Sequence, residues 1–529
     1  MISLRMNRTD FENDIRALLM AFYYGEKIVL DAPEWEVCLQ VVYRPDGGIH
    51  ARLQDASGRT MEGESGAASG KLTEAEAPDA SETAAEGKCR PGAEPETEAA
   101  AAEGMKPLKL ADDPAAYRGR RNEVKQLIYR LLGDFTGRTL PWGTLTGIRP
   151  TKLAMEIFER GGSDEDAAAY LRETYLTSGE KAALCAEVAR NEQAILQGID
   201  YENTYSLYVG VPFCPSICAY CSFSSYPLSV WQSRTDDYVD ALLKEIEAAS
   251  HMLPGRKPVT FYMGGGTPTS LSAAQLDRVL GSIRDHFDLS AAREMTVEAG
   301  RPDSIIADKL QVIKDHGISR ISINPQTMNQ RTLDLIGRRH TALQIHEAFD
   351  LARRIGFDNI NMDLIAGLPG ERAEDMRHTM AEITAMAPEN VTVHSLALKR
   401  AAFLNQNREQ FPVAGAEEVN EMIRISREGA ARIGARPYYL YRQKNIAGNL
   451  ENVGYAKPGT EGLYNILIME EKQSILALGT GASSKFVMKG IGDTVRIERV
   501  ENVKSVGDYI SRIDEMIGRK ERFLAGNAL

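Results

Sequence analysis

The sequence predicts an α/β protein whose largest part is a partial, TIM-like barrel of six β/α units. From residue 205 onward, short apolar stretches typical of buried strands alternate with helix-like stretches such as 236–252, 272–286 and 341–355. The connections are short, and this alternation favours parallel strands joined by crossover helices. The predicted strands are 206–211, 259–263, 294–298, 319–324, 359–365 and 390–396. In such a barrel the chemistry lies at the carboxyl ends of the strands.

The barrel is expected to be one of several parts, because 529 residues exceed a single ordinary core. We expect a small α+β module at 1–54, an acidic linker at 55–106, a mainly helical region at 107–200, the barrel at 201–400 and a C-terminal extension at 401–529.

The first module contains one helix and three strands. Residues 9–24 have apolar side chains at helical spacing, and strand-like stretches follow at 26–31 and 35–43. The sequence Pro-Asp-Gly-Gly at 45–48 is typical of a hairpin turn, and it leads into a third strand at 49–54.

Residues 55–106 have the composition of a disordered linker. This segment has 12 acidic and 5 basic residues, so it holds −7 of the net charge of −12, and Leu72 is its one residue of the types Leu, Ile, Val and Phe. Such a segment cannot bury enough apolar surface to offset the entropy lost on ordering. The alternative is an insertion between two elements of one domain, because long surface insertions cost little closure entropy.

The region that follows is predicted to be helical. Residues 122–132 place their apolar side chains on one face, as an amphipathic helix does. Further helices are expected at 151–160, 165–174 and 179–196. The loop 138–150 interrupts them with Gly, Pro and Trp, and a loop of this kind either packs or binds.

The C-terminal extension combines helices and strands. We expect a helix at 416–434, a strand at 436–442, a loop at 443–462, strands at 463–469 and 474–479, and a helix at 505–518.

Composition excludes several classes of protein. No apolar run reaches the ~18 residues of a membrane span, and the N-terminus lacks a signal peptide's apolar core. Cys38, Cys89 and Cys185 are scattered and are expected to be free thiols, which suits a reducing, cytoplasmic location. The acidic balance argues against a nucleic-acid-binding protein.

The strongest chemical signal is a loop with three cysteines directly after the first barrel strand. Cys214, Cys218 and Cys221 have the spacing C-x3-C-x2-C. Three such thiolates can hold three irons of a cubane cluster and leave the fourth iron open to a small ligand. A zinc site or a disulfide network is the alternative. Zinc is normally closed by a fourth Cys or His, and no His occurs between His50 and His251.

This loop resembles the C-x3-C-x-aromatic-C motif of radical S-adenosylmethionine (SAM) enzymes. The frame Tyr208-x-x-x-Pro212-Phe213-Cys214 resembles the oxygen-independent coproporphyrinogen III oxidase family, most closely its HemZ-type coproporphyrinogen dehydrogenases. The resemblance implies a 4Fe-4S cluster on the three cysteines and SAM on its open iron. Cleavage of SAM would give a 5′-deoxyadenosyl radical that takes a hydrogen atom from the substrate. It also implies a partial barrel of six β/α units.

The resemblance further implies a set of SAM contacts at the strand ends. Glycines of a Gly-Gly-Gly segment let a backbone approach a ligand closely, although such a segment alone is usually a turn. A carboxylate at the end of a strand can accept hydrogen bonds from ribose hydroxyls or an amine. The positions that match the family are Tyr208, Tyr220 against the adenine, Gly265, Gly266, Thr267, Glu298, Gln326, Arg338 and Asp363. They are compatible with one SAM molecule or with two.

Two departures from the family keep three functions open. The related oxidases have His where this chain has Gly210. A haem-chaperone branch has a His-Asn-x-x-Tyr-Trp motif, and the comparable residues 451–456 keep the Asn and Tyr but lack the His. The alternative is that residues 449–456 form a turn rich in Gly and Asn. The first function is a radical SAM oxidoreductase that decarboxylates coproporphyrinogen in haem synthesis. The second is a haem- or porphyrin-binding chaperone, and the third is radical chemistry on another substrate, such as another tetrapyrrole. The expected partners are a tetrapyrrole and an electron donor of the flavodoxin or ferredoxin class.

Overall fold

The computed structural model describes residues 1–65, 72–74, 113–222, 225–398, 402–407, 411–443, 446–489 and 495–527. The chain forms two compact units. The first, here the N-terminal unit, comprises residues 1–186 and 442–450. The second, here the barrel unit, comprises residues 187–441 and 451–529.

The N-terminal unit contains a six-stranded sheet in the order β2-β1-β3-β4-β5-β6. The strands are β1 (Ile2–Met6), β2 (Ile28–Leu30), β3 (Val37–Tyr43), β4 (Ile49–Asp55), β5 (Thr60–Ser65) and β6 (Leu72–Glu74). The helices are α1 (Glu12–Phe22), α3 (Pro114–Thr136), α4 (Thr151–Glu159) and α5 (Asp164–Tyr175), while α6 (Gly179–Ile195) continues into the barrel unit. The predicted helices and the strands β2 to β4 are confirmed, whereas β1 was not expected.

The prediction of a disordered acidic linker at 55–106 is wrong for part of that segment. Residues 60–65 form β5, which pairs with β4, and β6 pairs with β5 in turn. Backbone pairing to an existing edge strand stabilises this polar sequence, which could not bury much surface by itself. Residues 66–71 and 75–106 of the predicted linker, Cys89 included, lie outside the described residues.

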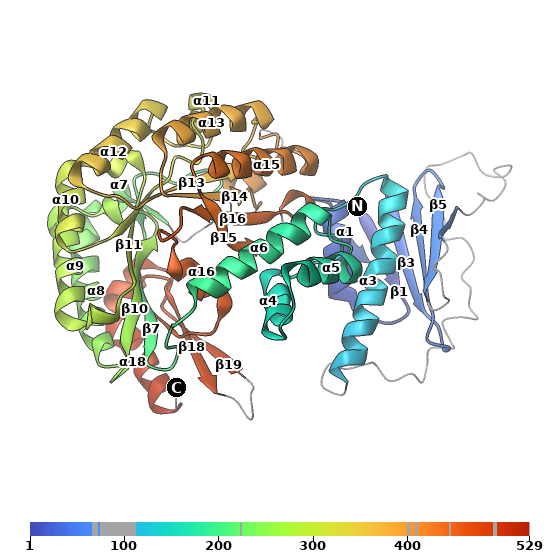
Figure 1. Ribbon diagram of the computed structural model, residues 1–529, viewed down its shortest axis with the longest axis horizontal. Coiled ribbons are helices and arrows are strands. Elements are labelled where there is room, and N and C mark those ends of the chain that lie inside the picture. Colours follow the sequence, from blue (N-terminus) through green and yellow to red (C-terminus); the bar gives the residue numbers. More distant parts are fainter. Residues whose placement is uncertain are drawn as a thin grey trace. The chain divides into compact units, whose positions relative to one another are not determined.

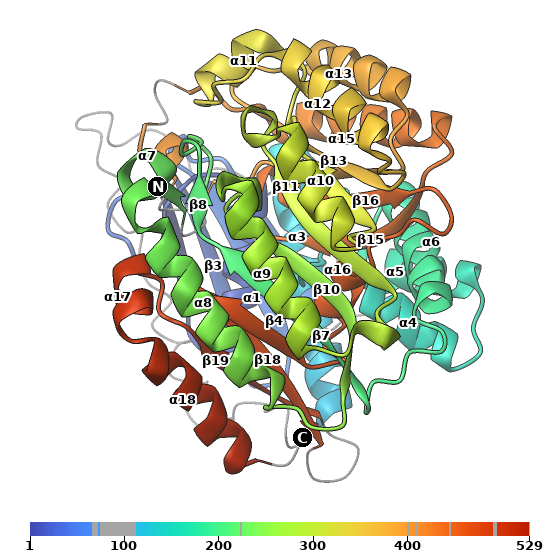
Figure 2. The same cartoon turned by 90° about the vertical axis from the view of Figure 1, so that its left-hand side faces the viewer.

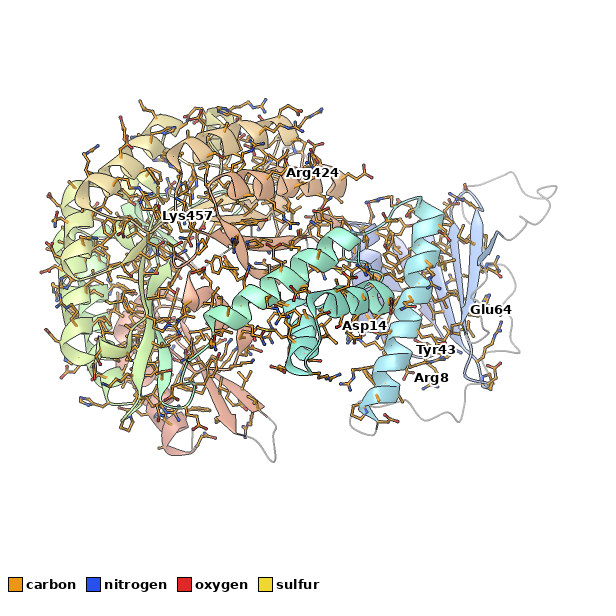
Figure 3. The ribbon with its side chains drawn as sticks, in the orientation of Figure 1. Arg8, Asp14, Tyr43, Glu64, Arg424 and Lys457 are labelled. Carbon is orange, nitrogen blue, oxygen red and sulfur yellow. The ribbon has the colours of Figure 1, made fainter. Side chains whose placement is uncertain are left out.

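The helices α1 and α3 share one hydrophobic core with the sheet of this unit. Apolar side chains of α1 and α3, such as Leu18 and Ile128, are buried in the same cluster as those of the sheet. Asp14 of α1 accepts a hydrogen bond of 2.6 Å from Arg121 of α3, and Tyr43 donates one of 2.7 Å to the Asp10 carbonyl (Figure 3). The helix α3 therefore completes the α+β module rather than forming a separate layer.

The loop 138–150 packs. Trp142 is fully buried, and the Arg442 guanidinium lies over its ring at 5.2 Å while donating to the Leu145 carbonyl at 2.8 Å. The packing alternative of the prediction is therefore confirmed.

The barrel unit is built on an open sheet of eleven strands in the order β15-β16-β14-β13-β12-β11-β10-β7-β17-β18-β19. All six predicted parallel strands are present, and they lie side by side in chain order. They are β7 (Thr204–Val211), β10 (Lys257–Gly265), β11 (Glu294–Gly300), β12 (Arg320–Ile323), β13 (Ile360–Ala366) and β14 (Asn390–Ser395). The partial β/α barrel is thus confirmed.

Further strands extend this sheet at both edges. β16 (Glu451–Ala456) pairs antiparallel to β14 and lies next to β15 (Arg436–Arg442). β17 (Ile475–Gly479) pairs parallel to β7, and the hairpin of β18 (Ser483–Lys489) and β19 (Val495–Glu501) follows.

Crossover helices cover one side of the sheet, here the outer face (Figures 1 and 2). They are α8 (Thr235–Ser250), α9 (Ala273–His286), α10 (Ala307–Asp315), α12 (Ala342–Ile355), α13 (Ala373–Met386) and α15 (Ala416–Arg432). Shorter helices are α7 (Leu228–Trp231), α11 (Gln330–Leu335), α14 (Phe403–Gln406) and α16 (Leu463–Glu470), and α17 (Val506–Ser511) and α18 (Ile513–Ala525) end the chain. Two of the crossover helices, α9 and α12, begin with capping boxes at Ser272 and Thr341.

The strands carry apolar side chains on the outer face and polar ones on the opposite, inner face. Successive side chains point to opposite faces of a strand. On β12, for example, Ile321 and Ile323 alternate with Arg320 and Ser322, and all four are buried. Polar residues on the inner faces of parallel strands are unusual, because such strands usually read as continuous apolar runs. The inner face is therefore the place where a polar ligand fits.

Two predictions in the C-terminal extension are wrong. Residues 463–470 form the helix α16 and not a strand, since a short run of apolar residues does not distinguish the two. The predicted loop 443–462 is wrong at residues 451–456, which form β16. Gly454 is needed there because a Cβ would lie 1.8 Å from the Tyr439 ring. The predicted helix 505–518 is the pair α17 and α18, whose break lies at Arg512.

A buried polar network fixes the C-terminal helices to the barrel. The Lys520 ammonium of α18 lies 2.6 Å from the Glu245 carboxylate of α8, and neither side chain is exposed. Glu245 also accepts hydrogen bonds from Asn502 at 2.8 Å, Tyr509 at 2.6 Å and the Gly479 amide at 2.8 Å. The network therefore holds the end of β17, which pairs with β7 directly before the cysteine loop.

None of the helices in the described part of the chain combines the length and the apolar composition that a membrane crossing requires.

Candidate active site

The three predicted cysteines lie on a loop that begins where β7 ends. Pro212 follows the strand, and Phe213 and Cys214 form the short strand β8, which pairs with β9 (Tyr226–Pro227). The amide of Ala219 donates to the Ile336 carbonyl at 2.9 Å, and Leu404 donates to the Ala219 carbonyl at 3.0 Å. Segments distant in sequence therefore hold the loop from two sides.

Each cysteine sulfur has a polar neighbour. The Thr267 hydroxyl donates to Cys214 Sγ at 3.5 Å, Arg301 Nη1 donates to Cys218 Sγ at 3.7 Å, and Cys221 Sγ lies 3.6 Å from the Ser225 hydroxyl. Burial raises the pKa of the Cys214 thiol to about 11, and the nearby Cys221 and Cys218 raise it further, while Thr267 lowers it. As thiolates, the three groups would need a cationic partner, and iron would be one.

The donor set fits a cluster better than a single ion. Among the described residues, no three His, Cys, Asp or Glu side chains stand close enough together to hold one metal ion. A cubane cluster binds each thiolate through a separate iron, so its ligands surround a larger volume. Three cysteines on one loop, with hydrogen-bond donors at two of their sulfurs, are compatible with such a cluster, and its assignment stays a prediction.

Arg301 is a residue of this site that the sequence did not reveal. Its buried guanidinium forms a two-point ion pair with Asp303 at 2.9 and 2.7 Å and donates to the Ser216 carbonyl at 3.1 Å. It thereby fixes the cysteine loop and places a positive charge beside Cys218. It follows the third strand directly, and this position after Glu298 and Gly300 was the only signal in the sequence.

The Gly-Gly-Gly segment contacts the cysteine loop directly. The Gly266 amide donates to the Val211 carbonyl and the Thr267 amide to the Phe213 carbonyl, both at 2.7 Å. Gly265 has φ +107°, which favours glycine. A Cβ on Gly266 would lie 2.7 Å from the Phe213 carbonyl oxygen and 3.0 Å from Cys214 Sγ. The segment therefore lies where a ligand bound to the loop would meet bare backbone.

Glu298 and a group of tyrosines line the inner face beside this segment. Tyr262 donates to Glu298 at 2.5 Å, and a Cβ on Gly264 would lie 2.9 Å from Glu298 Cδ, so this glycine leaves room for the carboxylate. The rings of Tyr208 and Tyr262 are stacked with that of Tyr464 from α16, with centroids 6.1 and 4.5 Å away. Tyr464 was missed because its segment was predicted as a strand.

Burial raises the pKa of the Glu298 carboxyl to about 7. The nearby Asp363 raises it as well, whereas the hydrogen bond from Tyr262 and the charge of Arg320 lower it. Glu298 therefore exchanges its proton near neutral pH, as a group poised for a cationic or hydroxyl-bearing ligand does.

Replacing Glu298 with glutamine is expected to remove a pH-dependent destabilisation. Between its ordinary pKa of 4.5 and the folded value of about 7, the folded chain keeps a proton that the unfolded chain loses. The free energy of unfolding therefore falls as the pH rises through this window, by about 1.4 kcal/mol per pH unit and about 3 kcal/mol in all. Urea unfolding is measured from pH 5 to 8. The free energy of unfolding of Glu298→Gln should rise relative to that of the wild type as the pH increases to 7. A difference that does not change with pH would contradict this.

Gln326, Asp363 and Arg338 extend the site along β12 and β13. Gln326 has φ +69°, and its backbone bridges to β13 because its amide donates to the Asp363 carbonyl at 2.9 Å. Burial lowers the pKa of Arg338, but the adjacent Tyr220 and Cys218 outweigh it, so the pKa is raised and the guanidinium stays charged. Most of the predicted SAM contacts therefore lie on or shortly after the parallel strands β7 and β10 to β13, while Tyr220 and Arg338 lie beside Cys218. Their assignment to SAM stays a prediction.

His394 on β14 is a second side chain that the sequence analysis missed. Its Nε2 lies 4.0 Å from the Asp363 carboxylate, and its Nδ1 lies 3.2 Å from the Tyr441 hydroxyl. Burial lowers the pKa of the imidazole, while Asp363 raises it. A lone polar residue near the end of the sixth strand was the signal that could have found it.

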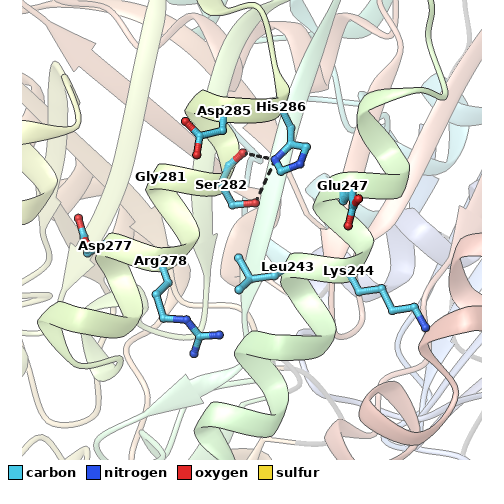
Figure 4. Close-up of a pocket in the computed structure, with 9 residues that line it drawn as sticks. All are labelled: Leu243, Lys244, Glu247, Asp277, Arg278, Gly281, Ser282, Asp285 and His286. Carbon is cyan, nitrogen blue, oxygen red and sulfur yellow. Dashed lines mark hydrogen bonds between the residues drawn. The ribbon is translucent and has the colours of Figure 1, made fainter.

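A surface pocket lies elsewhere in the barrel unit. It is lined by charged residues of the outer helices α8 and α9, among them Lys244, Glu247, Arg278 and His286 (Figure 4). None of the predicted site residues lines it, and it is open to solvent among side chains that are mostly paired at the surface.

The chain is similar to several known proteins. The model of the radical SAM superfamily matches residues 208–383. Over 413 residues the chain is 42% identical to the oxygen-independent coproporphyrinogen-III oxidase-like protein HemZ of Bacillus subtilis (strain 168), covering 77% of this chain and 82% of that protein. Over 318 residues it is 32% identical to the heme chaperone HemW of the same strain, covering 59% and 76%. The solved structure of coproporphyrinogen III oxidase HemN from Escherichia coli, a radical SAM enzyme, has 24% identity and a TM-score of 0.48, covering 62% of this chain and 73% of that one.

Proposed function

Because this chain belongs to the radical SAM superfamily and to its family of oxygen-independent coproporphyrinogen III oxidase-like proteins, we propose that it decarboxylates propionate side chains of a tetrapyrrole. Coproporphyrinogen III is the proposed substrate, and protoporphyrinogen is the product. The 42% identity to the HemZ protein over most of both chains supports this choice of substrate class.

The observation that carries the proposal is the juxtaposition of the cysteine loop with the polar inner face. Cys214, Cys218 and Cys221 would hold a 4Fe-4S cluster, and Gly266 and Thr267 would meet the SAM bound to it. When bound, these cofactors supply a 5′-deoxyadenosyl radical that removes a hydrogen atom from the substrate. The protein positions the substrate and excludes water.

The chain's own side chains suit both tasks. Arg301 and Thr267 donate to cysteine sulfurs and thereby stabilise their negative charge. Tyr208, Tyr262 and Tyr464 present stacked rings on the inner face, which the pyrrole rings of a tetrapyrrole can pack against. Loss of a hydrogen atom to the 5′-deoxyadenosyl group and then of carbon dioxide would turn a propionate into a vinyl group, and the one electron left on the substrate would pass to an electron acceptor. The electron donor of the flavodoxin or ferredoxin class would supply the separate electron that the cleavage of SAM requires.

The alternative is a haem-binding chaperone, which the 32% identity to HemW supports. The segment comparable to the chaperone motif is β16, and all six of its residues are buried. Asn452 is used inside the sheet, where its side chain accepts from the Ser395 amide at 2.9 Å and donates to the Tyr441 carbonyl at 3.2 Å. A haem ligand from this segment is therefore disfavoured, and the enzymatic function is preferred.

Position 210 distinguishes this chain from the oxidases. Gly210 has no side chain to offer, and a Cβ there would lie 3.2 Å from the Tyr208 ring. An imidazole for the site must therefore come from another strand, and His394 lies beside Asp363. This difference is the reason for testing the reaction directly.

The test is an anaerobic assay of reduced, iron-reconstituted protein with SAM and coproporphyrinogen III. Formation of protoporphyrinogen together with 5′-deoxyadenosine would support the proposal. Stoichiometric haem binding without turnover would support the chaperone function. Cleavage of SAM without decarboxylation would reject coproporphyrinogen as the substrate while retaining radical chemistry on another one.

A further inference from the structure

The inner face of β12 carries a row of polar atoms that have no partner. Arg320 and Ser322 alternate with isoleucines on this strand, so they lie on the same face, and Asn324 follows directly after the strand. Within the described part of the chain, Arg320 Nε and Nη2, Ser322 Oγ and Asn324 Oδ1 are buried and make no hydrogen bond. Arg320 and Ser322 are each 2% exposed.

Several polar side chains on neighbouring strands do have partners. On β13 and β14, Asn361 donates to Asp363 at 2.7 Å and accepts from Thr392 at 2.9 Å. On β11, Thr296 donates to Glu294 at 2.6 Å. A buried charge without a partner is among the costliest features of a folded protein, and such groups are usually satisfied by a ligand, an ion or water.

The surroundings of Arg320 keep it charged but leave two of its nitrogens without an acceptor. Burial lowers the pKa of the guanidinium, but the neighbouring Tyr438, Glu294, Tyr262 and Tyr439 outweigh it, so the pKa is raised. Glu294 forms no ion pair with it, because its two oxygens accept from Thr296 and from the Tyr464 amide at 2.8 Å. Gly462 makes room for the guanidinium, since a Cβ there would lie 3.3 Å from Arg320 Cζ.

We propose that Arg320, with Ser322 and Asn324 beside it, binds a carboxylate of the substrate at the inner face of the barrel. Nε and Nη2 are the two donors along one edge of a guanidinium, and this edge binds a carboxylate through two parallel hydrogen bonds. The inference rests on the proposed function, whose substrate carries several propionates. One propionate held at Arg320 would orient another toward the cysteine loop.

The first test asks whether the site binds a carboxylate at all, independently of the reaction. Thermal unfolding of the full, reconstituted protein is measured in sodium propionate and in sodium chloride of equal ionic strength. Propionate should raise the midpoint of the wild type and not that of Arg320→Met, while Arg320→Lys keeps part of the response. Arg354→Met, at an exposed position of α12, should behave as the wild type.

Stability in chloride separates a ligand-binding role from a structural one. Removing a buried, unpaired charge should leave Arg320→Met at least as stable as the wild type. A variant that is less stable and still responds to propionate would overturn the proposal. An ordered water on Nε and Nη2 in a structure solved with propionate would overturn it as well.

The second test uses the tetrapyrrole. The Kd of coproporphyrin III should rise about tenfold or more in Arg320→Met, as expected for hydrogen bonds to a charged group, whereas that of its tetramethyl ester should not change. An equal loss for acid and ester would reject carboxylate binding.

If the wild type responds to propionate but does not decarboxylate coproporphyrinogen, the proposed function fails and the carboxylate site stands. If it decarboxylates and Arg320→Met does so equally well, the carboxylate site fails alone.

Discussion

Replacing Cys214, Cys218 or Cys221 with alanine is expected to abolish both the visible absorbance of a reconstituted cluster and the cleavage of SAM. Each cysteine would ligate a separate iron, so loss of one leaves two open corners and a labile cluster. Formation of 5′-deoxyadenosine should fall to background. The measurements are iron and sulfide content, the absorbance spectrum and chromatographic detection of the product, all under anaerobic conditions.

Cys38→Ala is the matched control for these variants. Cys38 is also a buried free thiol, but it lies on β3 of the N-terminal unit. This variant should keep the cluster and SAM cleavage at wild-type levels. Retention of both by Cys214→Ala, or one equivalent of zinc in place of iron in the wild type, would refute the cluster assignment.

Replacing Gly266 with alanine is expected to lower SAM cleavage by about 100-fold or more. The added Cβ would lie 2.7 Å from the Phe213 carbonyl oxygen and 3.0 Å from Cys214 Sγ, and the first of these atoms is backbone that cannot rotate away. The cysteine loop or the glycine segment must shift, and a misplacement of about 1 Å in a positioned site costs on the order of 100-fold in rate. The measurements are the rate of 5′-deoxyadenosine formation and the Kd of SAM.

Gly281→Ala provides the control for an added methyl group. Gly281 lies on α9, where a Cβ would meet only His316 Cε1 at an ordinary 3.7 Å. Because alanine favours helix, this variant should be as active as the wild type and about 0.5–1 kcal/mol more stable. If Gly266→Ala were also fully active, the close approach of the two segments would have no role in catalysis.

The sequence predicted the barrel because its information there is local. Each strand is a short apolar run between helical stretches, and parallel pairing follows from that alternation. The cysteine loop could be predicted equally well, because its three cysteines and their spacing lie within eight residues of chain. The glycines at 264–266 gained their meaning from their place after the second strand, and the contacts of Gly266 with Cys214 agree with it.

Other parts of the site come from long-range contacts that no local pattern encodes. Arg301 is 83 residues from Cys218 in the sequence. Tyr464 stacks with Tyr262 from a helix whose short apolar run had been predicted to be a strand. Residues 451–456 were predicted to lie in a loop, yet they form a strand in which Gly454 is required by the Tyr439 ring. The residue type at such positions is determined by tertiary contacts and not by the local sequence.

The sequence by itself determined the six parallel strands, the loop with three thiol ligands and the family to which they point. Only the tertiary structure decided which polar side chains face the interior without partners, and Arg320 is the example. Strand periodicity can place a residue on a face, but satisfaction of its hydrogen bonds depends on every element that surrounds it. That property is set by packing, and it distinguishes an arginine that supports the fold from one that is free to bind a ligand.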